Sequence, residues 1–161
     1  MLEFALSRNP FEAAIGVATA NALSHMLHDL EPKKFSVSKI DILDLIKPED
    51  RVVMVGYFAP LVPRILKITE KLTILEKREI EFPETTTLPS EKAREILPPA
   101  SDVMILSAST LANRTFDELL SFRGAAREVV LLGPSAPLYP APPFFSRGIT
   151  AIMGTRIIDP P

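Results

Sequence analysis

Residues 51–56, Arg-Val-Val-Met-Val-Gly, decide the fold of this chain. The run is short, apolar and rich in β-branched residues, and it ends in glycine, which is typical of a strand buried on both faces of a parallel sheet. Four more runs of this kind follow: LTILEK (72–77), DVMILS (102–107), REVVLLG (127–133) and ITAIMG (149–154). Helical segments or long crossovers separate them, and this alternation predicts an α/β protein.

The expected architecture is a three-layer, Rossmann-like parallel sheet of about five strands. Right-handed crossovers favour the strand order 2-1-3-4-5 and place helices on both faces. The long connection between the second and third strands leaves room for an extra edge strand around residues 79–82. We expect one domain over residues 1–161, with leading helices over 1–48 and the sheet domain over 51–161.

Capping signals place the helices. Asn9 is a good N-cap and Pro10 suits the first helical position, so a helix is expected to begin there. The proline-rich segment 134–145 is expected to form no regular helix. The other predicted helices cover residues 39–46, 60–71, 90–96 and the segment that follows Thr115.

Composition excludes several classes of function. A net charge of −2 and a pI near 5.7 give no electrostatic reason to expect a nucleic-acid partner. Cysteine is absent, so thiolate nucleophiles and thiolate metal ligands are absent too. The chain shows no signal peptide and no membrane-spanning run, which predicts a cytoplasmic protein. The absence of glutamine, with 16 prolines, suggests a thermophilic source.

Ligands of open α/β sheets bind beyond the carboxyl ends of the strands, where the strand order reverses. The candidate ligand-binding residues leave those ends. They are Gly56, Tyr57, Phe58, Glu76, Ser107, Ser109, Thr110, Asn113, Gly133, Pro134, Ser135 and Gly154.

These residues favour a small polar ligand over a dinucleotide. Tyr57 and Phe58 fill the space that a glycine-rich turn leaves for a pyrophosphate, so NAD binding is disfavoured. The aromatic pair could instead stack on a flat heterocycle or seal the sheet. Glu76 could accept hydrogen bonds from ligand hydroxyls or be a solvated strand end. Helix capping explains Thr115, but not the hydroxyl and amide groups before it, which could hold a carboxylate or phosphate.

His25 and His28 are weak metal candidates. Three residues apart on the first helix, they could share one face, but a stable site usually needs a third ligand. The two histidines lie together and early in the chain, so no Ser-His-Asp arrangement is visible, and no residue is a convincing general acid or base.

Several segments together resemble the “putative heavy-metal chelation” domain family, a domain of unknown function. They are EAAIGVATANAL, VGYFAPLVPRILK, LTILEKR, ILPPASDVMILSASTLANRTFDELL, REVVLLGPSAPLYP and GITAIMGTRIIDP. The resemblance implies a Rossmann-like domain that usually follows a smaller α/β domain of enolase-amino-terminal type, with a site between them. It also implies a role in making or processing a pterin-, flavin- or siderophore-like chelator.

This resemblance gives the leading hypothesis, a small-molecule-binding domain in metal or metal-chelator metabolism, with catalysis left open. The alternative is a non-catalytic binding or regulatory subunit that completes a partner's site. The few residues before the first helix suggest that the smaller domain is missing, so a partner or another copy would supply half of the cleft. A small-residue stripe at Gly16 and Ala20, with exposed apolar groups at Leu138, Tyr139, Phe144 and Phe145, therefore predicts a homo-oligomer. The sequence identifies no cofactor.

Overall fold

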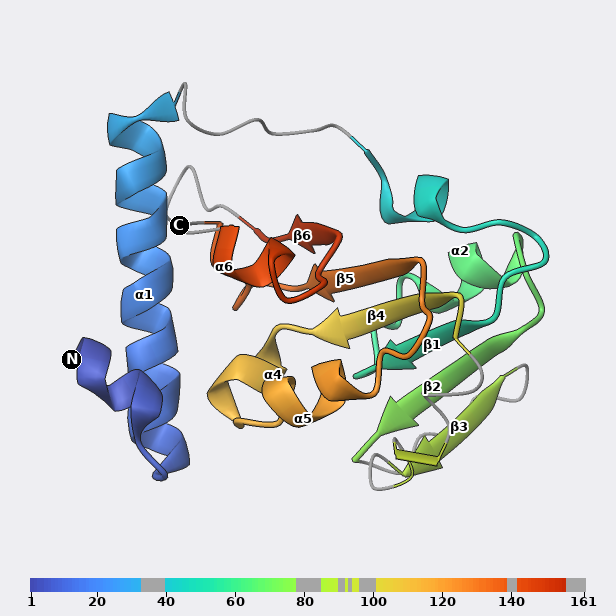
Figure 1. Ribbon diagram of the computed structural model, residues 1–161, viewed down its shortest axis with the longest axis horizontal. Coiled ribbons are helices and arrows are strands. Elements are labelled where there is room, and N and C mark those ends of the chain that lie inside the picture. Colours follow the sequence, from blue (N-terminus) through green and yellow to red (C-terminus); the bar gives the residue numbers. More distant parts are fainter. Residues whose placement is uncertain are drawn as a thin grey trace. The chain divides into compact units, whose positions relative to one another are not determined.

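The computed structural model describes residues 1–32, 40–77, 85–89, 92, 94–95, 101–138 and 142–155 of the chain. Six strands form one parallel sheet in the order β3-β2-β1-β4-β5-β6 (Figure 1). The five strands predicted from the sequence all occur, and in the predicted order. They are β1 (Val52–Val55), β2 (Leu72–Glu76), β4 (Val103–Ser107), β5 (Glu128–Leu132) and β6 (Ala151–Met153).

The sixth strand, β3 (Thr86–Pro89), lies at the edge of the sheet and pairs with β2 in parallel. The sequence analysis places no strand at these residues. This strand is hard to predict from the sequence because it ends in Pro89, and proline is tolerated in sheets mainly on edge strands. The edge strand expected at residues 79–82 lies outside the described residues.

The chain divides into two compact units. The central unit consists of Lys39–Ser107 and Asp117–Val130 and contains β1 to β4 with most of β5. The terminal unit consists of Met1–Ser38, Ala108–Phe116 and Leu131–Pro161 and contains both ends of the chain and β6.

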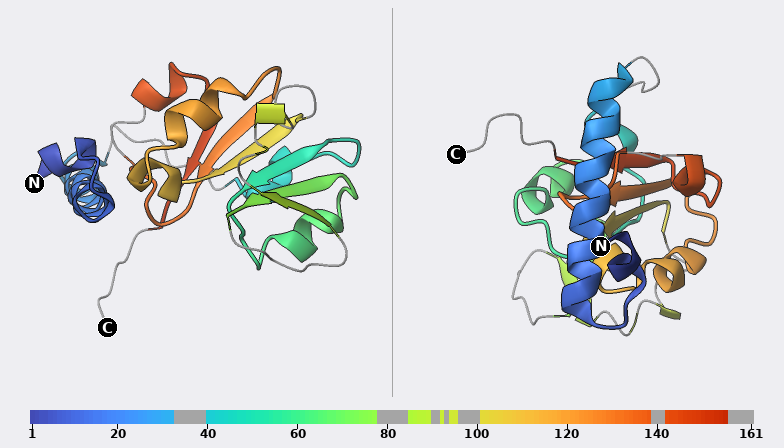
Figure 2. Two further views of the ribbon diagram at one scale, coloured as in Figure 1. Left: turned by 90° about the horizontal axis from the view of Figure 1, so that it is seen from below. Right: turned by 90° about the vertical axis from the view of Figure 1, so that its left-hand side faces the viewer.

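The core of the central unit is apolar sheet covered by short helices. All four residues of β1 are buried, as are Val103 to Leu106 in β4. Helix α2 (Val62–Leu66) lies on one face of these strands, while α5 (Phe116–Ser121), which continues into this unit, lies on the other (Figure 2). Right-handed crossovers on either side of β1 require this arrangement.

Two predicted helices are shorter than expected. The segment expected to be helical over 60–71 forms only α2. Of the segment expected over 39–46, the described residues 40–46 form a single 3₁₀ turn, η3 (Ile42–Leu45). Asp41 caps η3 in a capping box with Asp44.

In the terminal unit, a 3₁₀ helix, η1 (Leu2–Leu6), precedes helix α1 (Pro10–Leu30) and packs against its side (Figure 2). Asn9 caps α1 as predicted, accepting the Phe11 N–H at 3.0 Å. A Cβ built on Gly16 would lie 1.9 Å from the backbone nitrogen of Ala5, so only glycine permits this approach. The small-residue stripe was expected to contact another copy, but at Gly16 it packs against η1 of the same chain.

The proline-rich segment does contain one helical turn, α6 (Pro142–Phe145), contrary to expectation. Phe144 packs edge-on against Phe116 with ring centroids 5.8 Å apart, so it is not the exposed group predicted, whereas Phe145 is exposed. Leu138 is half-buried, and Tyr139 lies outside the described residues. Among the helices described, none has the length and apolar character needed to cross a membrane.

Candidate functional site

The strand order of the sheet reverses between β1 and β4, and this point is the switch point of the sheet. After β1 the chain adds β2 and β3 on one side, and after β4 it adds β5 and β6 on the other side. The two strands are parallel, so their carboxyl ends lie at the same end of the sheet (Figure 1). Gly56 follows β1 with a φ of +92°, and a Cβ there would lie 2.7 Å from the Cβ of Ser107, the last residue of β4. The two candidate residues are therefore in direct contact.

Glu76 ties the loop after β1 to the end of β2. Its carboxylate accepts the Tyr57 N–H at 3.0 Å and the Lys77 N–H at 2.8 Å. This geometry gives Glu76 a clear structural role beside its predicted ligand role. The acidic side chain predicted to meet ligand hydroxyls thus lies next to the aromatic pair.

Tyr57 and Phe58 are both half-buried where the chain leaves β1. The Phe58 carbonyl accepts the Leu61 N–H at 2.8 Å, which fixes the turn that leads into α2. The structure therefore brings Gly56, Tyr57, Phe58, Glu76 and Ser107 together at one edge of the central unit.

The other candidate residues belong to the terminal unit. Ser109 and Thr110 begin a short helix, α4 (Ser109–Ala112). Ser109 is exposed and Thr110 is buried. Asn113 accepts both the N–H and the hydroxyl of Thr115, at 3.1 and 2.7 Å. Its amide thus forms the turn before α5, a local role beside its predicted ligand role.

Gly133, Pro134, Ser135 and Gly154 do come together. Gly133, with a φ of +124°, receives the Ala136 N–H to close a turn, and a Cβ on Gly154 would lie 2.9 Å from the Ala136 carbonyl oxygen. The sequence did not predict their neighbour on α1: Asn21 Nδ2 donates to the Pro134 carbonyl at 3.2 Å. The other amide atom, Oδ1, is buried without a hydrogen-bond partner. No pattern around Asn21 marks it, because its partner lies 113 residues away.

The residues of α1 do not form a metal site of the usual kind. His25 and His28 are half-buried, and the Nδ1 atom of His28 lies 3.9 Å from the Asp29 carboxylate. Within the described ranges, no three side chains of His, Cys, Asp or Glu group closely enough to hold an ion. This donor set does not fit a resident heavy metal, which usually takes three or four ligands.

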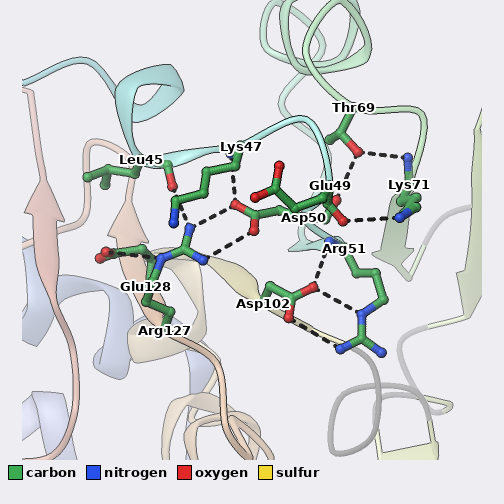
Figure 3. Close-up of polar contacts among 10 residues, drawn as sticks. All are labelled: Leu45, Lys47, Glu49, Asp50, Arg51, Thr69, Lys71, Asp102, Arg127 and Glu128. Carbon is green, nitrogen blue, oxygen red and sulfur yellow. Dashed lines mark hydrogen bonds and ion pairs between the residues drawn. The ribbon is translucent and has the colours of Figure 1, made fainter.

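A network of charged side chains lies at the amino ends of the strands of the central unit (Figure 3). Arg127 donates to both carboxylate oxygens of Asp50, at 3.2 and 2.8 Å, and Arg51 pairs with Asp102 at 3.0 Å. The sequence analysis did not predict these pairs, because their members lie 77 and 51 residues apart.

Hydrogen bonds from arginine explain the shifted pKa values at this edge. The Arg127 side chain lowers the pKa of Asp50, whose side chain is 4% exposed. The side chain and backbone N–H of Arg51 lower the pKa of Asp102 from 3.8 to about 2. Structural ion pairs therefore account for these shifts without catalysis.

Comparison with known proteins connects this fold to one family. The profile of a family described as “Putative heavy-metal chelation” matches residues 39–161, so that α1 precedes the matched region. An uncharacterized protein of Methanocaldococcus jannaschii is 29% identical over 150 residues, which cover 92% of this chain and 56% of that protein.

Two solved structures of proteins with unknown function from the DUF364 family share the fold. The protein from Desulfitobacterium hafniense has a TM-score of 0.77 and 27% identity, covering 92% of this chain and 57% of its own. The protein from Pyrococcus horikoshii has a TM-score of 0.72 and 29% identity, covering 86% of this chain and 55% of its own. This chain thus spans little more than half the length of these relatives. Because the family profile matches well over half of the chain, the protein belongs to the family described as “Putative heavy-metal chelation”.

Proposed function

We propose that the protein is a small-molecule-binding domain in heavy-metal or metal-chelator metabolism, with a pterin-, flavin- or siderophore-like compound as ligand. Membership of the family supports the connection with metals. The remaining support comes from the described geometry of the central unit.

The proposal rests on one observation. Two half-buried aromatic residues, Tyr57 and Phe58, follow β1 at the switch point of the sheet, where Gly56 after β1 contacts Ser107 at the end of β4. Such switch points are the usual ligand sites of doubly wound sheets. Tyr57 and Phe58 offer stacking surface for a flat ring, while Glu76 and Ser107 offer polar groups beside it. Separately, the candidate residues of the terminal unit stay predictions of ligand contact in that unit: Ser109, Thr110, Asn113, Gly133, Pro134, Ser135 and Gly154.

The chemistry of the donor groups favours a chelating compound over a bare ion. The chain has no cysteine, and its two histidines lie on one helix without a third ligand in the described part of the chain. Soft metals prefer sites rich in thiolate and imidazole. The family description is therefore better met if the metal arrives already held by a small molecule.

Titration with fluorescent pterin and flavin probes tests this function. Stacking on an aromatic side chain should quench the probe, and Tyr57→Leu should weaken binding about tenfold, corresponding to roughly 1.4 kcal/mol. Ser121→Ala, at an exposed hydroxyl of α5, is the matched control and should bind as wild type does. A catecholate chelator with and without Fe³⁺, measured by calorimetry, extends the test to siderophore-like ligands.

Equal affinity of Tyr57→Leu and wild type for every bound probe would refute the site. Binding to none of the three classes would refute the function. Binding without turnover of any probe would favour the alternative, a binding or regulatory subunit that completes a partner's site.

A further inference from the structure

A β-turn of residues 133–136 follows β5 in the terminal unit. The Ala136 N–H closes it by donating to the Gly133 carbonyl at 3.0 Å. Types I and II of such a turn differ by a flip of the central peptide, and type II requires a positive φ at the third residue, here Ser135. In the described part of the chain, Arg114 is the only non-glycine residue with a positive φ. The turn is therefore not type II, and its central peptide, between Pro134 and Ser135, has a defined orientation.

Strand β6 and the residue after it contact the two ends of this turn. The Gly133 N–H donates to the Met153 carbonyl at 2.9 Å. At the other end, a Cβ on Gly154 would lie 2.9 Å from the Ala136 carbonyl oxygen, so the two backbones are close. These contacts hold the first and last residues of the turn, but they do not fix the central peptide.

Asn21 of α1 makes the contact with the central peptide. Its Nδ2 donates to the Pro134 carbonyl at 3.2 Å. A carbonyl oxygen only accepts, so the NH₂ side of the amide must face it. The Oδ1 atom of Asn21 is buried and has no hydrogen-bond partner among the described residues. Burying an unpaired acceptor is unfavourable, so packing alone does not explain an amide at this position.

The bond from Asn21 sets the direction of the Ser135 N–H. In a planar trans peptide the carbonyl and the N–H point in opposite directions. The Pro134 carbonyl faces Asn21, so the Ser135 N–H points away from it. Over the described ranges this N–H donates to no backbone carbonyl, and Ser135 is half-buried. The turn thus offers two donors on one residue, the N–H and the hydroxyl of Ser135.

We propose that Asn21 is a positioning residue, which holds the central peptide so that the N–H and hydroxyl of Ser135 bind a carboxylate oxygen of the ligand. Hydrogen bonds to a charged oxygen are about twice as strong as those between neutral groups, which favours a carboxylate as the acceptor. The inference rests on the proposed function and narrows its ligand to carboxylate-bearing chelators. Asn21 itself acts through the turn and does not contact the ligand.

Nuclear magnetic resonance of the full chain without ligand tests the positioning. The Ser135 amide should be rigid in wild type, with an order parameter of about 0.85, and should fall below about 0.6 in Asn21→Leu and Asn21→Ala. Asn21→Leu keeps the volume of the side chain but removes the donor. Thr19→Ala is the matched control, because the Thr19 hydroxyl bonds only within α1, to the Ile15 carbonyl.

Titration with citrate, a carboxylate chelator, tests the binding. Citrate should shift the Ser135 amide resonance of wild type and of Thr19→Ala. Both Asn21 variants should bind it roughly threefold to tenfold more weakly, because the central peptide is correctly oriented for only part of the time. Urea denaturation should leave Asn21→Leu close to wild type in stability, since losing the bond and removing the buried, unpaired oxygen act in opposite directions.

A Ser135 amide that stays equally rigid in both Asn21 variants would overturn the inference. So would a wild-type Ser135 resonance that citrate does not shift, or citrate affinities that are the same in wild type and in both variants. The proposed function fails on different evidence, namely the fluorescent and catecholate probes and the Tyr57→Leu variant. The failure of one is therefore distinguishable from the failure of the other.

Discussion

At the scale of the residue, Gly56 shows how a side chain's absence shapes the candidate site. Its φ of +92° lies in the region that favours glycine, and its contact with Ser107 leaves no room for a Cβ. The glycine was recognisable from the sequence as the end of a buried strand. Its partner was not, because nothing local shows that Ser107 lies beside it. Asn113 illustrates the converse: an amide predicted only to contact a ligand also forms the turn before α5.

Gly56→Ala should therefore lower the free energy of unfolding by about 1–3 kcal/mol, since it combines an unfavourable φ with a steric clash. Urea denaturation measures the change. Gly124→Ala is the matched control, because Gly124 also has a positive φ, of +53°, but in the left-handed region that other residues tolerate better. A loss at Gly56 no greater than at Gly124 would show that the contact with Ser107 adds nothing.

At the scale of the element, strands were easier to predict than helices. Buried parallel strands are marked by continuous apolar runs, and all five such runs became strands. The helix expected over 60–71 stops at Leu66 because the following residues serve another purpose: the Thr69 hydroxyl donates to the Asp50 carbonyl, and the Lys71 N–H donates to that hydroxyl. Hydrogen bonds between separate segments, such as the one from Thr69 to Asp50, cannot be predicted from the local residue pattern.

The arginine–carboxylate pairs at the amino-terminal edge should support the sheet unequally. Arg127→Ala removes the guanidinium donors of the Asp50 carboxylate, which is 4% exposed and keeps the Lys47 N–H, and it should cost about 1–3 kcal/mol of unfolding free energy. Arg51→Ala should cost less, because both members of the Arg51–Asp102 pair are well exposed. Denaturation of the two variants at neutral pH compares them, and a larger loss for Arg51→Ala would contradict this ranking.

The same pairs predict the dependence of stability on pH. Their carboxyl pKa values are lowered on folding, to about 2 for Asp102. Stability from these pairs is therefore fully present above the ordinary carboxyl pKa of 3.8 and is lost as the pH falls towards 2. Arg127→Ala should flatten the acid limb of the stability curve, which thermal melts from pH 5 to pH 2 would reveal.

At the scale of the whole molecule, the strand order and the family were predictable, whereas the full set of site contacts was not. Strand order follows from the crossover rule and apolar runs. The candidate residues, however, fall into two compact units, and each group owes its geometry to partners far along the chain, such as Asn21 beside Pro134. Pairing patterns of that kind leave no periodic signal in one sequence.

Because the family is described by heavy-metal chelation, metal binding by the whole chain is the property to measure. We expect Zn²⁺ or Ni²⁺ to bind weakly and without defined stoichiometry, because two imidazoles on one helix supply at most half of a four-ligand shell. Calorimetry should give nearly the same weak signal for wild type and for His25→Ala/His28→Ala. Tight one-to-one binding that the double variant abolishes would show that the chain holds metal with its own side chains. The expected weak binding, combined with affinity for an Fe³⁺–catecholate complex, would place the metal in the ligand. The family's connection with chelation would then rest on recognition of a small molecule at the strand ends.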